Sequence, residues 1–237
     1  MLDASKEHIL DCGNGVRLLG AYSSRPENSN GLTILIHGWE GSIDSSYLLS
    51  AAGYLFDSGF DIFRLNLRDH GKSHHLNREL FNSTRLDEVV NGTRKIIHLF
   101  PHRHNYLAGF SLGGNFALRV GLQAPANDIP LDKIVAICPL VNPLNTTENM
   151  ERNLPVYHHY FVKKWQKSLQ KKITLFPDLG FNDTLCKLNS LNSMNDYFVP
   201  NHTDYATPEA YLNGYALTEE RLAELTVDSH IIASEDD

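Results

Sequence analysis

A serine flanked by glycines is the first feature of this sequence that could carry chemistry. Residues 109–113 read Gly-Phe-Ser-Leu-Gly and match the pattern G-x-S-x-G, with Ser111 at the centre. The match lies between an apolar segment at 106–108, which predicts a strand, and residues 115–120, which have the apolar spacing of a helix. A sharp strand-to-helix turn would expose the serine hydroxyl at a helix N-terminus, whose partial positive charge favours a developing oxyanion. The pattern therefore predicts Ser111 as the nucleophile of an acyl-transfer reaction.

A segment earlier in the chain could supply the other half of such a site. Residues 37–41 read His-Gly-Trp-Glu-Gly and directly follow the apolar run 33–36. A tetrahedral intermediate needs two backbone N–H groups, one just after the nucleophile and one from the loop that follows this early strand. These positions are Leu112 and Trp39, which we predict as the oxyanion donors. His37 is expected to brace the loop rather than to transfer a proton.

Strand and helix patterns alternate around these motifs. Residues 7–12 and 16–23 flank a Gly-Asn-Gly turn and predict an N-terminal β-hairpin. Because strand-length apolar segments then alternate with segments of helical period, we predict an α/β protein with a mostly parallel sheet and helices on both faces. The predicted strands are 33–36, 61–67, 105–110, 133–138 and 227–233, and the predicted helices are 45–57, 84–100 and 112–123.

The interval 143–225 breaks the alternation. It holds aromatic and basic stretches but no clear strand, so we predict a mainly helical, lid-like insertion, with ordinary crossover helices as the alternative. The predicted organisation is a first part of the core at 1–142, the insertion at 143–225, and the last core strand and acid loop at 226–237. Several aromatic residues of the insertion could line an acyl pocket, although such spacing more often packs a core. These residues are Tyr157, Tyr160, Phe161, Trp165 and Phe176.

Five short segments carry a resemblance to a known family. They are His-Gly-Trp-Glu-Gly-Ser at 37–42, Asn-Leu-Arg-Asp-His-Gly at 66–71, Leu-Asp-Glu-Val at 86–89, Gly-Phe-Ser-Leu-Gly-Gly at 109–114 and Ala-Ser-Glu-Asp-Asp at 233–237. In this order and combination they resemble the α/β-hydrolase superfamily and, more narrowly, its YheT-like branch. The resemblance implies the α/β-hydrolase fold and hydrolysis of small-molecule or lipid-like carboxylic esters by a Ser, Asp and His triad. It implies neither a metal nor an organic cofactor.

The acid of the triad is expected on the loop after a late strand. The predicted strand 227–233 leads to Glu235, Asp236 and Asp237. The resemblance implies Asp237 as the acid, with Asp236 as the second choice. A plain acidic terminus is the alternative.

The histidine of the triad should follow the acid, yet the sequence ends at Asp237. The histidine takes the serine proton and returns it to the leaving group, which a carboxylate alone cannot do near neutral pH. Three explanations stay open: a fragment that lacks the final strand and helix, a natural truncation with little activity, or substitution by another histidine. We favour the fragment, because strand 227–233 would otherwise form a long apolar edge.

The loop after the predicted strand 61–67 carries three histidines that could substitute, namely His70, His74 and His75. Residues 68–71 read Arg-Asp-His-Gly and more simply predict a turn braced by an internal ion pair. The adjacent pair His74 and His75 lacks the i, i+4 spacing that places two metal ligands on one helix face.

Composition excludes several other classes of protein. Lys and Arg total 21 against 28 Asp and Glu, and the net charge of −7 gives no electrostatic footprint for nucleic acid. The three cysteines lie far apart, so neither a disulfide framework nor a cysteine zinc site is indicated. A basic and apolar leader is absent, as is any apolar run of about 18 residues, so we expect a cytoplasmic protein with no transmembrane segment.

Two functions other than ester hydrolysis remain open on the sequence. An acyltransferase would form the same acyl-enzyme on Ser111 and pass the acyl group to an alcohol instead of water. A non-catalytic relative would bind an acyl-bearing ligand without turning it over.

Overall fold

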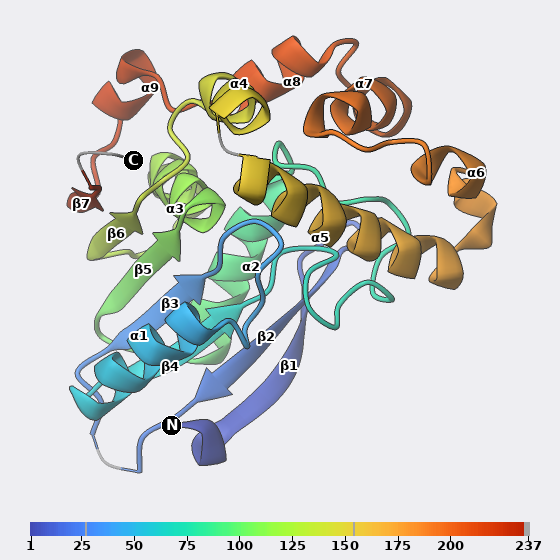
Figure 1. The fold of residues 1–237 in the computed structure, drawn as a ribbon. Coiled ribbons are helices and arrows are strands. Elements are labelled where there is room, and N and C mark those ends of the chain that lie inside the picture. The colour runs from blue at the N-terminus through green and yellow to red at the C-terminus, as the bar shows by residue number, and fades with distance from the viewer. Residues whose placement is uncertain (27, 154, 235–237) are drawn as a thin grey trace.

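A seven-stranded sheet forms the core of the described chain. The computed structural model describes residues 1–26, 28–153 and 155–234. The strands lie in the order β1-β2-β4-β3-β5-β6-β7, and Figure 1 shows the helices around them. The strands are β1 Ser5–Asp11, β2 Arg17–Ser23, β3 Leu32–Ile36, β4 Asp61–Leu65, β5 Asn105–Phe110, β6 Lys133–Ile137 and β7 Ser229–Ile232. The α-helices are α1 Ser46–Asp57, α2 Leu86–Leu99, α3 Leu112–Gln123, α4 Pro143–Asn153, α5 Pro155–Leu175, α6 Asn182–Leu185, α7 Leu191–His202, α8 Pro208–Gly214 and α9 Glu219–Ala223.

The first two strands form the predicted hairpin. β1 pairs antiparallel with β2 along its whole length, and β2 pairs antiparallel with β4. The three turn residues, Gly13, Asn14 and Gly15, all have positive φ. Glycine adopts this conformation without steric cost and asparagine tolerates it, which is why this turn can reverse the chain so tightly. The N-terminal hairpin is therefore confirmed.

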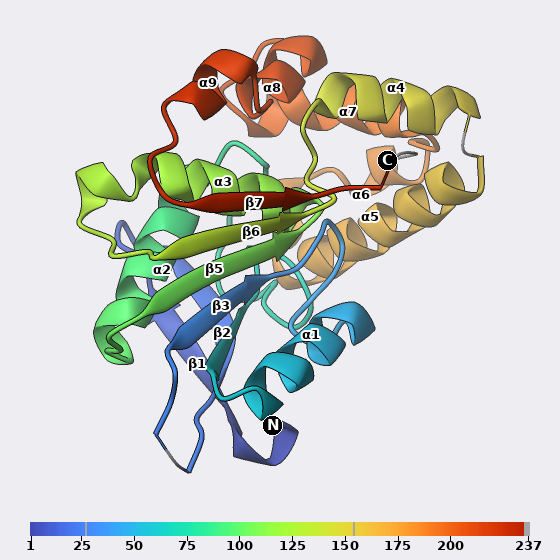
Figure 2. The same ribbon diagram turned by 90° about the vertical axis from the view of Figure 1, so that its left-hand side faces the viewer.

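The other five strands run parallel to one another. β4, β3, β5, β6 and β7 pair in that order, and every residue of β3 and β4 is buried. Strands buried on both faces need helices on both sides. Helix α1 covers one face and helices α2 and α3 cover the other (Figure 2). The predicted strands and core helices are confirmed, and their ends lie within two residues of the observed ones.

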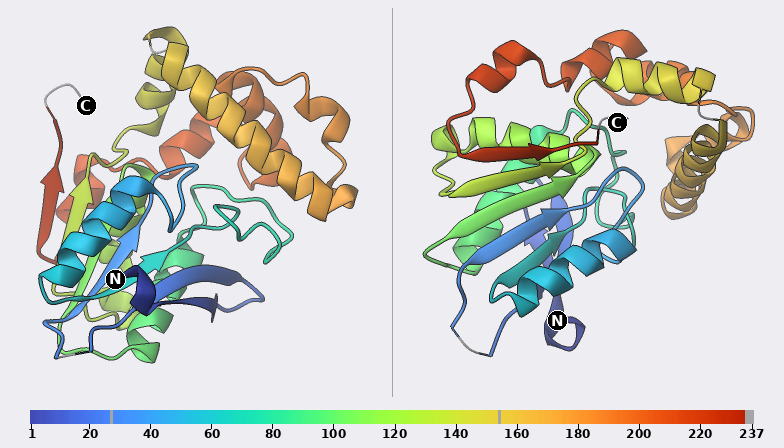
Figure 3. Two further views of the ribbon diagram at one scale, coloured as in Figure 1. Left: turned by 60° about the horizontal axis from the view of Figure 1, so that its bottom comes forward. Right: turned by 60° about the vertical axis from the view of Figure 1, so that its left-hand side comes forward.

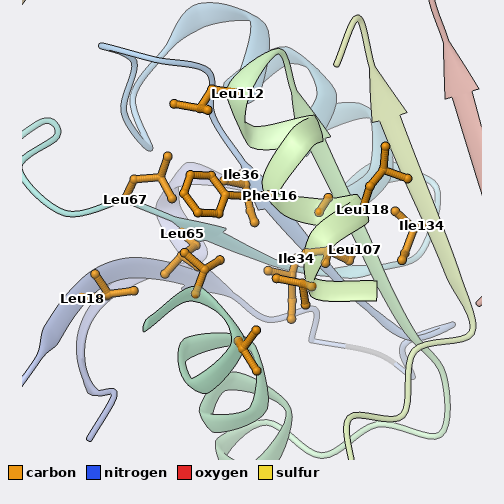
Figure 4. Close-up of a cluster of buried hydrophobic side chains, with 14 of the residues drawn as sticks. Leu18, Ile34, Ile36, Leu65, Leu67, Leu107, Leu112, Phe116, Leu118 and Ile134 are labelled. Carbon is orange, nitrogen blue, oxygen red and sulfur yellow. The ribbon is translucent and has the colours of Figure 1, made fainter. Parts of the chain in front are cut away.

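The larger hydrophobic cluster lies between the sheet and helix α3 (Figure 4). It joins Ile34 of β3 and Leu107 of β5 to Phe116 of α3. Leu112, the residue that follows the candidate nucleophile, belongs to the same cluster and is 2% exposed. Close packing of this kind resists displacement, so the core fixes the turn between β5 and α3 in place.

Helices α4 to α9 occupy the chain between β6 and β7; α4 and α5 lie beyond the carboxyl ends of the parallel strands, whereas α9 leads back to the start of β7 (Figures 2 and 3). We call this part the helical segment. A second cluster of buried apolar side chains joins α5, α6 and α7, and Leu80 from the loop after β4 belongs to it. None of the helices in the described ranges is long and apolar enough to cross a membrane.

Candidate active site

Ser111 stands at the turn between β5 and α3 in a strained backbone conformation. Its φ is 51° and its ψ is −118°, a combination that costs free energy for any residue with a side chain. Three backbone hydrogen bonds hold it there. Its N–H donates to the carbonyl of Ile137 over 2.9 Å, and its carbonyl accepts from Asn115 at 3.0 Å and Leu140 at 3.2 Å. The side chain is exposed, so the fold presents the hydroxyl for reaction.

Two glycines allow this turn to pack as closely as it does. A Cβ atom on Gly109 would lie 2.1 Å from the carbonyl oxygen of Gly113. A Cβ atom on Gly113 would lie 2.4 Å from the carbonyl oxygens of both Ile36 and His37. These contacts are with backbone atoms that cannot move aside. The G-x-S-x-G pattern thus reflects the close approach of the α3 N-terminus to the end of β3.

His37 fixes the loop that follows β3. Its Nε2 atom accepts from the N–H of Leu67 at 3.1 Å, and its Nδ1 atom lies 2.7 Å from the carbonyl of Gly38. Because Nε2 accepts, the ring proton resides on Nδ1 and is donated to that carbonyl. Complete burial lowers the pKa of His37 to about 3, so the ring is neutral. The prediction that His37 braces the loop is confirmed.

Two backbone donors at the site have no acceptor among the described residues. Tyr47 accepts a hydrogen bond from the N–H of Gly38 at 2.9 Å. The N–H groups of Trp39 and Leu112 donate to no atom in the part of the chain that the structure describes. Leu112 is the first residue of α3, where the first N–H groups lack intrahelical acceptors and carry partial positive charge. Both residues line a cavity together with Ser111.

Ser111 lies between two cavities. The inner cavity has a volume of about 170 Å³ and extends from Ser111 and Leu112 toward α4, α7 and α8. The outer cavity, of about 370 Å³, extends from Ser111 toward α1 and the middle of α5. Trp39 and Phe161 line both cavities, and their rings stack with centroids 5.2 Å apart and planes 9° apart. This stacked pair therefore forms a wall between the two cavities beside Ser111.

Comparison with family models gives the decisive observation. A model described as the alpha/beta hydrolase fold matches residues 33–218. The chain belongs to the α/β-hydrolase family. The match includes β3 except its first residue, the turn at Ser111 and helices α4 to α8. The α/β-hydrolase fold predicted from the sequence is confirmed.

Solved structures similar to this α/β hydrolase include serine hydrolases and esterases. A serine hydrolase without a lid from Xanthomonas campestris is 24% identical, with a TM-score of 0.48 over 58% of this chain and 62% of its own. A serine hydrolase homologue from Coxiella burnetii is 18% identical, with a TM-score of 0.48 over 57% and 64%. Est1E from Butyrivibrio proteoclasticus, solved with ferulic acid bound, is 19% identical, with a TM-score of 0.47 over 60% and 56%. The chain thus spans less than two thirds of the length of each of these proteins. Comparison with curated proteins gave no match.

The aromatic residues of the helical segment divide into two groups in this α/β hydrolase. Phe161 and Trp165 line the inner cavity with Ser111, and Tyr160 lines the outer one. Phe161 and Trp165 also pack against the second hydrophobic cluster, so the preferred expectation that these aromatics pack a core is confirmed for these two, which line the cavity as well. Tyr160 is 52% exposed, and for this residue the expectation is wrong. These residues belong to α5, which passes over the carboxyl ends of the strands. The apolar spacing within one helix does not reveal this path. Tyr157 is 60% exposed, and Phe176 lies against the ammonium group of Lys172.

Within the described ranges, the structure brings no histidine to the lining of either cavity. The Nδ1 atom of His70 lies 2.6 Å from the carbonyl of Arg68, and its buried Nε2 atom has no hydrogen-bond partner among the residues that the structure describes. The Nε2 atom of His74 lies 2.8 Å from the hydroxyl of Ser168. Burial lowers the pKa of His70 to about 4 and that of His74 to about 3. His75 is exposed, beside the carbonyl of Lys72.

The expected acid loop begins at the correct end of the sheet. Phe110 pairs with Ile137, and Ile137 pairs with Ile232, so β7 ends level with the strand that carries Ser111. The N–H of Cys138 donates to the carbonyl of Ile232 at 2.7 Å. Asp237 and Asp236, the two candidate acids, lie outside the described residues.

The charges of the loop after β4 pair with residues outside the segment 68–71. Arg68 donates to Glu88 at 2.7 and 2.9 Å and to Glu79 at 3.2 Å. Asp69 pairs with Lys172 of α5 at 2.6 Å. The expected internal ion pair is therefore wrong, because the buried charges find partners on α2 and α5 instead.

Lys172 fastens helix α5 to this loop. Its side chain is 1% exposed, and its Nζ atom also donates to the carbonyls of Asn77 at 2.6 Å and of His74 and Glu79 at 3.3 Å. Sequence analysis missed this residue, because 103 positions separate it from Asp69. Since Phe161 and Trp165 belong to the same helix, the ion pair also fixes the position of the cavity walls.

Proposed function

We propose that the chain hydrolyses carboxylic esters through an acyl-enzyme on Ser111. The observation that carries this proposal is the exposed hydroxyl of a strained serine that lines a cavity with Trp39 and Leu112, whose N–H groups have no acceptor in the described ranges. In the proposed reaction the serine oxygen attacks the ester carbonyl, and the oxyanion that forms accepts hydrogen bonds from both N–H groups. The alcohol then leaves with a proton, and water releases the acid from Ser111.

The two cavities suit the two halves of an ester. The inner cavity is lined largely by apolar side chains and would hold the acyl group. Its volume of about 170 Å³ is close to the roughly 150 Å³ of an apolar cavity that accommodates benzene, so an acyl group of about six carbons would fill it. The more open outer cavity would take the alcohol. The stacked rings of Trp39 and Phe161, which separate the two cavities, would then lie beside the ester bond.

The proposal assigns the other two triad roles to residues that are not among the described residues lining the two cavities. Asp237 is the proposed acid, and the register of β7 supports this choice because the strand ends level with Ser111. Within the family order a histidine follows the acid, and we assign the general base to such a residue rather than to a histidine of the described chain. Membership of the YheT-like branch is part of the same proposal. So is the division into a core, at 1–142 and 226–237, and a lid-like insertion at 143–225.

Hydrolysis of p-nitrophenyl hexanoate by protein from the native source tests this function. Replacement of the nucleophile, Ser111→Ala, should reduce kcat by up to about 10⁶-fold, to the background rate. The matched control is Ser58→Ala, because Ser58 is an exposed serine outside both cavities. Its turnover should remain within a few-fold of the parent. Equal turnover by the parent and Ser111→Ala would rule out the proposed nucleophile.

A further inference from the structure

Helix α5 carries an unusual concentration of positive charge. It contains five lysines and no acidic residue, in a chain whose net charge is −7. Lys172 is buried in its ion pair with Asp69. The other four lysines line a groove of about 740 Å³ between α5 and residues 40–45, which we call the basic groove; they are Lys163, Lys164, Lys167 and Lys171.

The lysines of the basic groove repel one another on the helix surface. Lys163, Lys167 and Lys171 recur every four residues and therefore lie on one face of α5. Like charges at this spacing destabilise a helix. Within the described ranges, none of the four lysines forms an ion pair with an acidic side chain within 4.0 Å. An anion bound in the groove would remove this repulsion.

Acidic residues at the groove do not cancel its charge. Asp69 is neutralised by Lys172, and Asp44 lies 3.9 Å from Arg64. The pKa of Glu40 is raised to about 7, mainly because its carboxyl group is desolvated, while Lys164 and Lys171 lower it. Four lysines thus face two further acidic side chains, those of Glu40 and Asp44. The groove therefore keeps an excess of positive charge.

The basic groove is continuous with the outer cavity. Glu40, Gly41, Ser45, Tyr160 and Lys164 line both of them, and Ser111 lines the outer cavity. A molecule whose ester bond lies at Ser111 would therefore extend its alcohol part through the outer cavity toward the lysines. Lysine is a common ligand of phosphate in proteins. A phosphate carries several acceptor oxygens, so it can accept hydrogen bonds from more than one lysine of the basic groove.

We propose that the basic groove binds a phosphate group on the alcohol part of the ester substrate. This inference rests on the proposed function and names its substrate class. In the reaction, water and the ester give a carboxylic acid and a phosphate-bearing alcohol, and the phosphoester bond is not broken. The small inner cavity confines the acyl group, while the groove selects for the phosphate.

A pair of matched ligands tests the proposal without turnover. Hexanoylglycerol 3-phosphate and hexanoylglycerol differ only in the phosphate, and their binding to Ser111→Ala protein can be measured by calorimetry at low ionic strength. The phosphate ligand should bind at least tenfold more tightly, and added salt should reduce this difference. The double variant Lys163→Gln/Lys167→Gln, made in the same background, should bring the two affinities within about threefold.

The matched control is Lys187→Gln, because Lys187 is an exposed lysine of the helical segment outside the groove. This variant should retain the preference for phosphate. Equal affinities for the two ligands, or an unchanged preference in the double variant, would overturn the proposal. Binding to Ser111→Ala protein needs no catalysis. A failure of the ester-hydrolysis proposal would therefore leave the measured preference for the phosphate ligand unchanged. Vesicles of phosphatidic acid form a second arm: tighter binding there assigns the phosphate to a lipid headgroup, and weaker binding assigns it to a soluble ester.

Discussion

Replacing Lys172 with methionine should destabilise the protein far more than removing an exposed ion pair between the same parts of the fold. The Lys172–Asp69 pair is 2.6 Å long, and its side chains are 1% and 7% exposed. Methionine has a similar length and no charge, so Lys172→Met leaves the carboxylate of Asp69 buried without its partner. It also removes the donor from the carbonyl of Asn77, which accepts at 2.6 Å.

Breaking a buried pair in this way costs about 3–5 kcal/mol, because the remaining charge keeps its desolvation penalty. At this chain length a loss of that size lowers the melting temperature by on the order of 10 °C. The matched control is Arg78→Gln. Arg78 pairs with Asp178 at 2.5 Å and also joins the loop after β4 to the helical segment, but its side chain is 54% exposed. Exposed pairs contribute about 0–1 kcal/mol.

Urea unfolding followed by circular dichroism measures both free energies of unfolding. We expect a loss of several kcal/mol for Lys172→Met and little or no change for Arg78→Gln, whose ion pair is screened by water. The double variant Lys172→Met/Asp69→Leu should recover part of the loss, since no buried charge then remains unpaired. Equal losses in the two single variants would refute the view that this buried ion pair fixes α5 in place.

Two further predictions concern the packing and the pH dependence of the site. Gly113→Ala places a Cβ atom 2.4 Å from two backbone oxygens, so it should abolish esterase activity and lower the free energy of unfolding. In the control Gly53→Ala the new Cβ atom has no neighbour within 4 Å, so this variant should be neutral or slightly stabilising in urea unfolding. Retained activity in Gly113→Ala would contradict the packing argument. The pKa of His37 is lowered to about 3 in the folded protein, below its ordinary value of 6.5, so the unfolded chain binds more protons between these values. The contribution of His37 to the free energy of unfolding should therefore be complete above pH 6.5. Below that pH it should decrease by about 1.4 kcal/mol per pH unit. This part of the slope should disappear in His37→Gln and persist in His75→Gln, measured as unfolding free energy at pH 7 and pH 5; an unchanged slope in His37→Gln would show that the ring is not buried and neutral.

Local patterns were sufficient to predict the elements that position the nucleophile. The mostly apolar run of β3, the Gly-Asn-Gly turn after β1 and the helical spacing of α3 each reflect interactions between residues close in sequence or one layer of packing. The pattern at 109–113 predicted a sharp strand-to-helix turn at Ser111, and the φ of 51° at this residue agrees with it. Backbone geometry at this turn depends on the two glycines, so sequence carries the signal directly.

Features made by distant residues could not be predicted in the same way. The partners of Asp69 and Arg68 come from α5 and α2, and no local pattern distinguishes them from other Lys and Glu residues. Phe161 and Trp165 have the spacing of ordinary core residues, and only the path of α5 over the strand ends makes them cavity walls. The basic groove likewise depends on which face of α5 meets residues 40–45.

The most direct test of the central claim is fluorophosphonate labelling of the protein from its native source, followed by peptide mapping by mass spectrometry. A fluorophosphonate reacts with a serine that is activated for acyl transfer and leaves a stable adduct on its oxygen. The account predicts one adduct, on the peptide that carries Ser111, and its loss when an ester substrate competes. A protein that stays unlabelled, or an adduct on a different serine, would contradict the assignment of Ser111 as the nucleophile.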